Sequence, residues 1–165
     1  MIFKNNPERG VSMMEMMIVI VIVGLLSALA VPNFGGAIKK MKFDNTGREI
    51  VSALRYARAA AVGQQRQLGV FFDTDNKVMI TFVDLVDPTA GTFVSGDSVV
   101  RRDSMNTNLN YMGSSFANST VIFNPNGTAS QRGDVVCSGT NGGSTRSFSV
   151  SLVAGSGRAK LESYN

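Results

Sequence analysis

The stretch GVSMMEMMIVIVIVGLLSALAVP, residues 10–32, decides how this chain is organised. Its apolar part runs from Val11 to Val31 and contains a single charged residue, Glu15. A helix rises about 1.5 Å per residue, so this part is about 30 Å long, the thickness of the hydrocarbon core of a bilayer. The sequence therefore predicts a transmembrane helix over residues 11–31. A carboxylate inside such a segment is costly, so Glu15 either lies near the membrane interface or serves a function.

A short basic leader, MIFKNNPERG, precedes the apolar segment. Basic residues just before such a segment favour a cytoplasmic N-terminus, which places the rest of the chain beyond the inner membrane. An ordinary secretory signal has its small-residue cleavage site after the apolar region, whereas here Gly10 stands before it. The alternative is a plain signal anchor in which Glu15 reaches to the interface.

The order of Gly10, Val11, an apolar run and Glu15 resembles the processing signature of the type IV pilin superfamily. That superfamily includes the type IV pilins and the pseudopilins of type II secretion. The resemblance implies that a prepilin peptidase cuts between Gly10 and Val11, that Val11 is N-methylated, and that the apolar helix stays in the mature protein. It also implies that Glu15 pairs with the new α-amine of Val11, in the same chain or a neighbouring one, and so sets the register of assembly. Val11 departs from the Phe or Met that usually follows the cleaved bond.

Composition argues against an enzyme. The 165 residues include no His and one Cys, with a net charge of +4. Hydrolases of the Ser-His-Asp or Cys-His kind need a base that titrates near neutrality, usually His, and zinc sites need His and Cys clusters. We therefore expect no catalytic residue, no metal and no cofactor. Cys137 is either a reactive thiol or an incidental small residue, and Asp73 with Asp75 forms either a weak Ca²⁺ site or, with too few oxygen ligands, a solvated hairpin.

Helical spacing continues beyond the apolar segment and ends near Gly63. A second apolar face, which a sheet should cover, is formed by Ile50, Ala53, Leu54, Ala57, Ala60 and Ala61. Arg48, Arg55 and Arg58 are expected on the opposite side of the helix. Asp44 and Gly47 predict a weak point at which the helix restarts.

From Leu68 the pattern changes to short strands separated by turns. The predicted strands are residues 68–72, 77–83, 99–101, 109–112, 120–123, 148–153 and 158–161. Residues 73–76 and 124–127 are predicted turns, and the Gly/Ser-rich segment 133–144, which carries Cys137, is predicted to be a loop. The fold is therefore α+β, with a long N-terminal helix packed against a small antiparallel β-sheet domain. The expected boundaries are 1–10 for the leader, 11–63 for the helix and 64–165 for the β-rich domain.

Three later segments, LRYARAAA (54–61), FNPNGTA (123–129) and GRAK (157–160), resemble the GspH/FimT subgroup of minor pilins and pseudopilins. This resemblance implies a structural subunit in the bacterial inner membrane whose partners are the prepilin peptidase, sister pilins or pseudopilins, and the inner-membrane assembly platform. Type II secretion and type IV pilus assembly both remain open.

Two alternative functions remain. Some FimT-type pilins contact DNA through a Gly-Arg-x-Arg motif, so Arg158 and Lys160 are candidate DNA-binding residues. Lys160 keeps the charge of that motif and loses the bidentate fork of arginine, so phosphate binding would be weak and salt-sensitive. The other alternative is a monomeric membrane-anchored binding domain.

Overall fold

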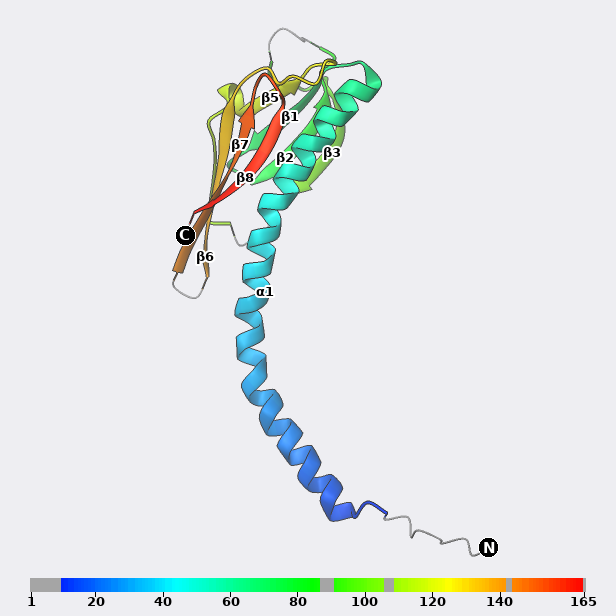
Figure 1. The fold of residues 1–165 in the computed structure, drawn as a ribbon, viewed down its shortest axis with the longest axis vertical. Coiled ribbons are helices and arrows are strands. Elements are labelled where there is room, and N and C mark those ends of the chain that lie inside the picture. Colours follow the sequence, from blue (N-terminus) through cyan, green and yellow to red (C-terminus); the bar gives the residue numbers. More distant parts are fainter. Residues whose placement is uncertain (1–9, 87–90, 106–108, 142–143, 165) are drawn as a thin grey trace, which may run out of the picture. The chain divides into compact units, whose positions relative to one another are not determined.

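The computed structural model describes residues 10–86, 91–105, 109–141 and 144–164, apart from the side chains of residues 29–34, 141, 163 and 164. The chain divides into two compact units, Met1–Ile38 and Lys39–Asn165. A single helix, α1 (Met13–Gln64), contributes its first part to one unit and its second part to the other (Figure 1). The remaining elements are β1 (Leu68–Asp73), β2 (Val78–Val83), β3 (Ser98–Ser104), β4 (Tyr111–Ser114), the 3-10 turn η1 (Ala117–Ser119), β5 (Thr120–Phe123), β6 (Gly133–Asn141), β7 (Ser144–Val153) and β8 (Arg158–Tyr164).

The strands form two four-stranded antiparallel sheets. Sheet A has the order β3-β2-β1-β5, and sheet B has the order β4-β6-β7-β8. Turns connect β1 to β2 and β7 to β8. Asp73 pairs with Val78 at the first of these turns, and Val153 pairs with Arg158 at the second. The predicted turn at residues 73–76 is confirmed, because Asn76 donates its backbone N–H and its side-chain amide to the carboxylate of Asp73, at 3.0 and 2.8 Å.

The main core lies between the second part of α1 and the inner faces of both sheets. Ile50, Leu54 and Ala57 of α1 are fully buried there with Phe72 of sheet A and Val150 of sheet B. Figure 1 shows this part of α1 lying along the sheets. The predicted apolar face of the helix is therefore confirmed, and so is the α+β fold with an N-terminal helix packed on antiparallel sheets.

A smaller apolar cluster lies on the opposite face of sheet A. The ring of Phe93 packs against Phe71 and Phe82, with ring centroids 5.5 and 5.0 Å away. The loop that carries Phe93 is fastened by Asp97, whose carboxylate accepts the backbone N–H groups of Leu85 and Val94 at 3.1 and 2.9 Å. This loop thus covers apolar surface of sheet A. Residues 87–90 lie outside the described residues.

The predicted restart of the helix near Asp44 and Gly47 is wrong, because α1 continues through both residues. Gly47 is buried, and a Cβ at this position would lie 2.8 Å from the side chain of Leu161 and 3.2 Å from Phe148. The glycine therefore allows close packing of α1 on β7 and β8. Burial of this side of the helix outweighs the low helix propensity of glycine, which costs about 1 kcal/mol relative to alanine.

The predicted loop over residues 133–144 is also wrong, because residues 133–141 form β6 in the middle of sheet B. This strand pairs with β4 on one side and β7 on the other. Val135 and Cys137 point into the core, and Gly133 is required by packing, since a Cβ there would lie 2.5 Å from the ring of Phe116. Glycine and serine are weak strand formers, but pairing on both sides overrides that preference.

Arg58 differs from its expected position on the solvent side of the helix. Its side chain is half-buried, and its Nε donates a hydrogen bond of 2.9 Å to the carbonyl oxygen of Gly127. Gly157 packs against the same groups, because a Cβ at that position would lie 2.4 Å from the Gly127 oxygen and 3.0 Å from Nε of Arg58. An arginine of α1 thus holds together two of the segments that resemble the GspH/FimT subgroup, residues 123–129 and 157–160.

Substituting Gly157 with alanine is expected to destabilise the second unit by about 3 kcal/mol, because Gly157 has a φ of +58° and its new methyl would meet backbone. Gly155→Ala in the same turn is the matched control, since a Cβ there meets nothing within 4 Å. Chemical denaturation of both variants measures the difference. Equal stabilities would contradict the packing described for this turn.

Candidate functional site

The first part of α1 and the residues just before it present an apolar surface in which Glu15 is the one charged residue. Its large apolar side chains from Val11 to Leu26 are between 49% and 86% exposed in the single chain. These side chains are Val11, Met13, Met14, Met16, Met17, Ile18, Val19, Ile20, Val21, Ile22, Val23, Leu25 and Leu26. An exposed apolar area of this extent marks a surface that is covered by lipid or by other protein.

Glu15 lies in the first turn of α1 and is exposed. It is the only charged residue between Gly10 and Ile38. The N-terminus of a helix carries a partial positive charge, so a carboxylate in the first turn favours the helix start at this point. Gly10 and Val11 precede the helix and are exposed, which leaves the bond between them accessible.

The predicted transmembrane segment is not established by the helix itself. Within the described residues, no helix combines the length and the apolarity that crossing a membrane requires. The span over residues 11–31 therefore stays a prediction.

Arg158 and Lys160 lie on β8 with their side chains on one exposed face of the strand, opposite the buried Ala159. Nζ of Lys160 forms an ion pair with Oε1 of Glu162 at 3.0 Å. Arg101 and Arg146 are also paired, Arg101 with Asp103 at 2.7 Å and Arg146 with Asp44 at 3.7 Å. These carboxylates reduce the positive potential that phosphate binding uses. DNA binding by Arg158 and Lys160 stays a prediction.

Cys137 is buried on β6, and burial raises the pKa of its thiol to about 12. Because the thiolate is the nucleophile, a thiol with this pKa is unreactive near neutral pH. The two hydrogen bonds from Asn76 are the main reason why the pKa of Asp73 is lowered. The Asp73 carboxylate therefore stabilises the hairpin turn. Among the described residues, no three His, Cys, Asp or Glu side chains lie close enough together to hold a metal ion.

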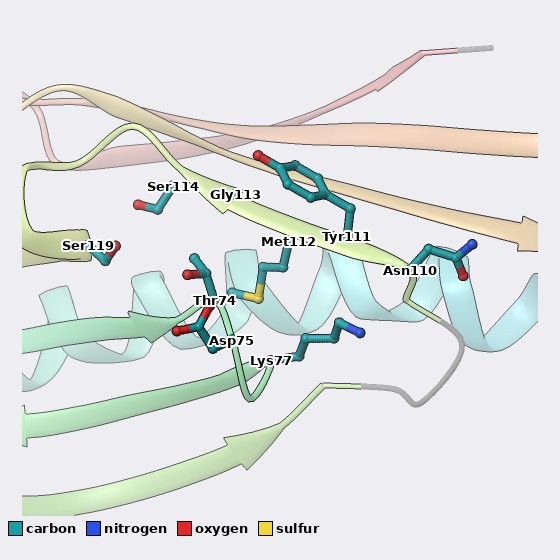
Figure 2. Close-up of a pocket in the computed structure, with 9 residues that line it drawn as sticks. All are labelled: Thr74, Asp75, Lys77, Asn110, Tyr111, Met112, Gly113, Ser114 and Ser119. Atoms are coloured by element: carbon teal, nitrogen blue, oxygen red, sulfur yellow. The ribbon is translucent and has the colours of Figure 1, made fainter.

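The second unit also contains a polar cleft of about 480 Å³, which no pattern in the sequence predicts. It lies between the β1–β2 turn and β4, and Figure 2 shows side chains from both segments around it. Thr74, Asp75 and Lys77 line one wall, and Tyr111 and Ser114 line the other. These segments are about forty residues apart and carry no shared motif, so only the fold brings them together.

An N-terminal helix with an apolar first part and a β-rich unit on its second part is the architecture of a pilin-like subunit. The family model of the type II transport protein GspH matches residues 46–156, and the prokaryotic N-terminal methylation motif matches residues 5–31. The chain therefore belongs to the GspH family of minor pseudopilins and pilins, a family of structural proteins.

Solved structures share this fold. The minor pseudopilin EpsH from the type 2 secretion system of Vibrio cholerae is 12% identical, with a TM-score of 0.55 over 73% of this chain and 95% of that one. The type IV minor pilin FimU of Pseudomonas aeruginosa is similar in two crystal forms. One is 22% identical, with a TM-score of 0.51 over 72% of this chain and 91% of FimU; the other is 18% identical, with a TM-score of 0.53 over 74% and 90%. No curated protein matches the sequence.

Proposed function

We propose that the chain is a minor subunit of a pilus-like filament, in a type II secretion pseudopilus or a type IV pilus. The observation that carries the proposal is the exposed apolar part of α1, which begins at a methylation motif and contains one carboxylate. A surface of this kind needs lipid before assembly and neighbouring helices after it. The protein is thus a structural component and performs no chemistry of its own.

Processing by a prepilin peptidase prepares the helix for assembly. Cleavage between Gly10 and Val11 leaves an α-amine at the start of α1, which is then N-methylated on Val11. This amine and the Glu15 carboxylate are each costly in apolar surroundings, and pairing offsets much of that cost. A subunit that enters the filament in the wrong register leaves both charges unpaired. Glu15 therefore selects the axial register of the helix bundle.

Before assembly the subunit resides in the inner membrane with residues 11–31 as its span. The basic leader keeps the N-terminus in the cytoplasm, and the unit from Lys39 onward lies in the periplasm or on the filament. Its partners are the peptidase, the inner-membrane assembly platform and sister pilins or pseudopilins. One of the solved relatives is a minor pseudopilin of a type 2 secretion system and another is a type IV minor pilin, so both settings remain candidates.

Glu15→Val is expected to leave membrane insertion and cleavage intact and to lower the recovery of the subunit in sheared filaments about tenfold or more. The substitution removes the partner of the Val11 amine while it keeps the helix apolar. Immunoblots of the membrane and sheared fractions from the same cells measure the ratio of incorporated to inserted subunit.

Glu49→Val is the matched control, because it removes an exposed carboxylate from the same helix outside the apolar segment. This variant should be incorporated like the wild type. Equal incorporation of the Glu15 and Glu49 variants would refute the role of Glu15 in register. A wild-type chain that is neither cleaved nor incorporated would instead favour a monomeric membrane-anchored binding domain.

A further inference from the structure

In the part of the chain that the structure describes, three of the four sheet edges are protected against pairing with another chain. The outer edge of β5 is covered by the chain itself, because Ser130 donates its backbone N–H to the oxygen of Ile122 and accepts the Ile122 N–H on its hydroxyl, at 2.7 and 3.1 Å. The edge strands β3 and β8 carry charged side chains, which disfavour strand addition. These side chains are Arg101, Arg102 and Asp103 on β3, and Arg158, Lys160 and Glu162 on β8.

The edge of β4 has neither kind of protection. Its residues, Tyr111–Ser114, include no charge and no proline, and among the described strands β4 pairs with β6 alone. The N–H of Ser115 donates to the carbonyl oxygen of Asp134 at 2.9 Å, so Ser115 faces β6. Residues of an antiparallel strand alternate between bonding to the partner strand and pointing away from it. The N–H and C=O groups of Met112 and Ser114 therefore point away from β6. Neither backbone has a hydrogen-bond partner within the described part of the chain. Four backbone groups are therefore open along this edge.

The open edge of β4 borders the polar cleft of about 480 Å³, a volume within the range of ligand-binding pockets. Figure 2 shows Thr74, Asp75 and Lys77 on the other side of the cleft, at the β1–β2 turn. The side chains of Asp75 and Lys77 form no ion pair or hydrogen bond with described residues, although the Lys77 carbonyl oxygen accepts the backbone N–H of Met105 at 2.8 Å. This wall therefore presents one free carboxylate and one free ammonium group. A cation and an anion close together favour an occupant with complementary charges.

We propose that the cleft binds an extended segment of a partner polypeptide, which adds to sheet B beside β4 as a fifth strand. Its backbone pairs with the open groups of Met112 and Ser114, in the manner of other strand-addition sites. A carboxylate on the added strand faces Lys77, and a basic residue faces Asp75. The partner is thus recognised by an extended backbone and by a short pattern of opposite charges. The proposal depends on the second unit alone and holds whether or not Glu15 sets the register of assembly.

The test uses the full chain in detergent micelles and a library of fluorescent peptides of about six residues. The peptides alternate valine or threonine with every combination of glutamate, lysine and glutamine. Peptides that contain both glutamate and lysine are expected to bind best and to slow amide hydrogen exchange at Met112 and Ser114 about tenfold, because a paired amide exchanges slowly. The same peptides with N-methylated backbones should not bind, since they cannot donate to β4.

Ser114→Pro removes the outward N–H of β4 without removing a hydrogen bond to β6, and it should weaken peptide binding about tenfold. Ser114→Ala, which keeps the N–H and loses the hydroxyl, is the matched comparison and should weaken binding clearly less than Ser114→Pro does. Lys77→Glu should shift the preference of the library from glutamate to lysine. Melting temperatures of all three variants show whether the second unit stays folded.

Three results would overturn the proposal. The first is that no peptide binds at concentrations up to about 1 mM, which corresponds to a binding free energy of only about −4 kcal/mol. The second is equal binding of the N-methylated peptides, which would mean that the cleft recognises side chains alone. The third is that a bound peptide slows exchange at other amides and leaves those of Met112 and Ser114 unchanged.

Discussion

Leu54→Asp is expected to lower the free energy of unfolding of the second unit by about 4 kcal/mol, a large part of the 5–15 kcal/mol typical of a domain. Leu54 is 1% exposed and lies in the core that α1 shares with both sheets. An aspartate there is an unpaired charge without water, and the apolar contacts of the leucine are lost as well. Thermal and urea denaturation of a fragment that begins at Lys39 measures the effect.

Ser52→Asp is the matched control, because it introduces the same side chain two residues earlier, on the exposed side of α1. Its stability should stay within about 0.5 kcal/mol of the wild type. If the Leu54 variant melted at the same temperature as the Ser52 variant, the assignment of the buried face of α1 would be wrong.

Gly10→Val is expected to abolish removal of the leader, because a branched side chain crowds the bond that the peptidase cuts. A folding defect is not expected as the cause, since a Cβ at Gly10 meets nothing within 4 Å. Intact mass of the membrane-extracted protein distinguishes the two forms: the wild type should begin at Val11, and the variant should retain residues 1–10. Filament incorporation should be lost together with cleavage.

Gly24→Val provides the control for this experiment. Gly24 lies inside the apolar segment, and a Cβ there also meets nothing within 4 Å. The substitution adds the same isopropyl group away from the scissile bond, so the leader should still be removed. A wild-type chain that keeps Met1 in cells with an active prepilin peptidase would contradict the proposed processing site.

Much of the fold could be predicted from local patterns. The alternation of apolar residues and the turn chemistry around Asp73–Asn76 predicted β1 and β2 to within a residue, and the strand predicted at residues 120–123 coincides with β5. The helical spacing of Ile50, Leu54 and Ala57 predicted which face of α1 is buried. These signals are readable because side-chain period and turn type depend on residues close together in the chain.

The wrong predictions share a different cause. The predicted helix restart at Gly47 and the predicted loop over residues 133–144 rest on the preferences of their own residues, which favour breaks and loops. In the structure, Gly47 is a close-packing position against Leu161, and β6 is held by pairing on both sides. Arg58 likewise bonds to Gly127, which lies 69 residues away in the sequence. Contacts of this range leave no periodic signal in the sequence.

The candidate sites also differ in whether neighbouring residues or distant contacts define them. Gly10, Val11 and Glu15 stand within six consecutive residues at the start of an apolar helix, so the sequence by itself determined where processing and register selection are expected. Spacing along one helix is a local property that needs no tertiary contact. The open edge of β4 and the charges of Asp75 and Lys77 became a site only in the folded chain. Tertiary structure decided it, because the pairing of β4 with β6 determines which backbone groups remain free, and the packing of the two sheets brings the β1–β2 turn beside them.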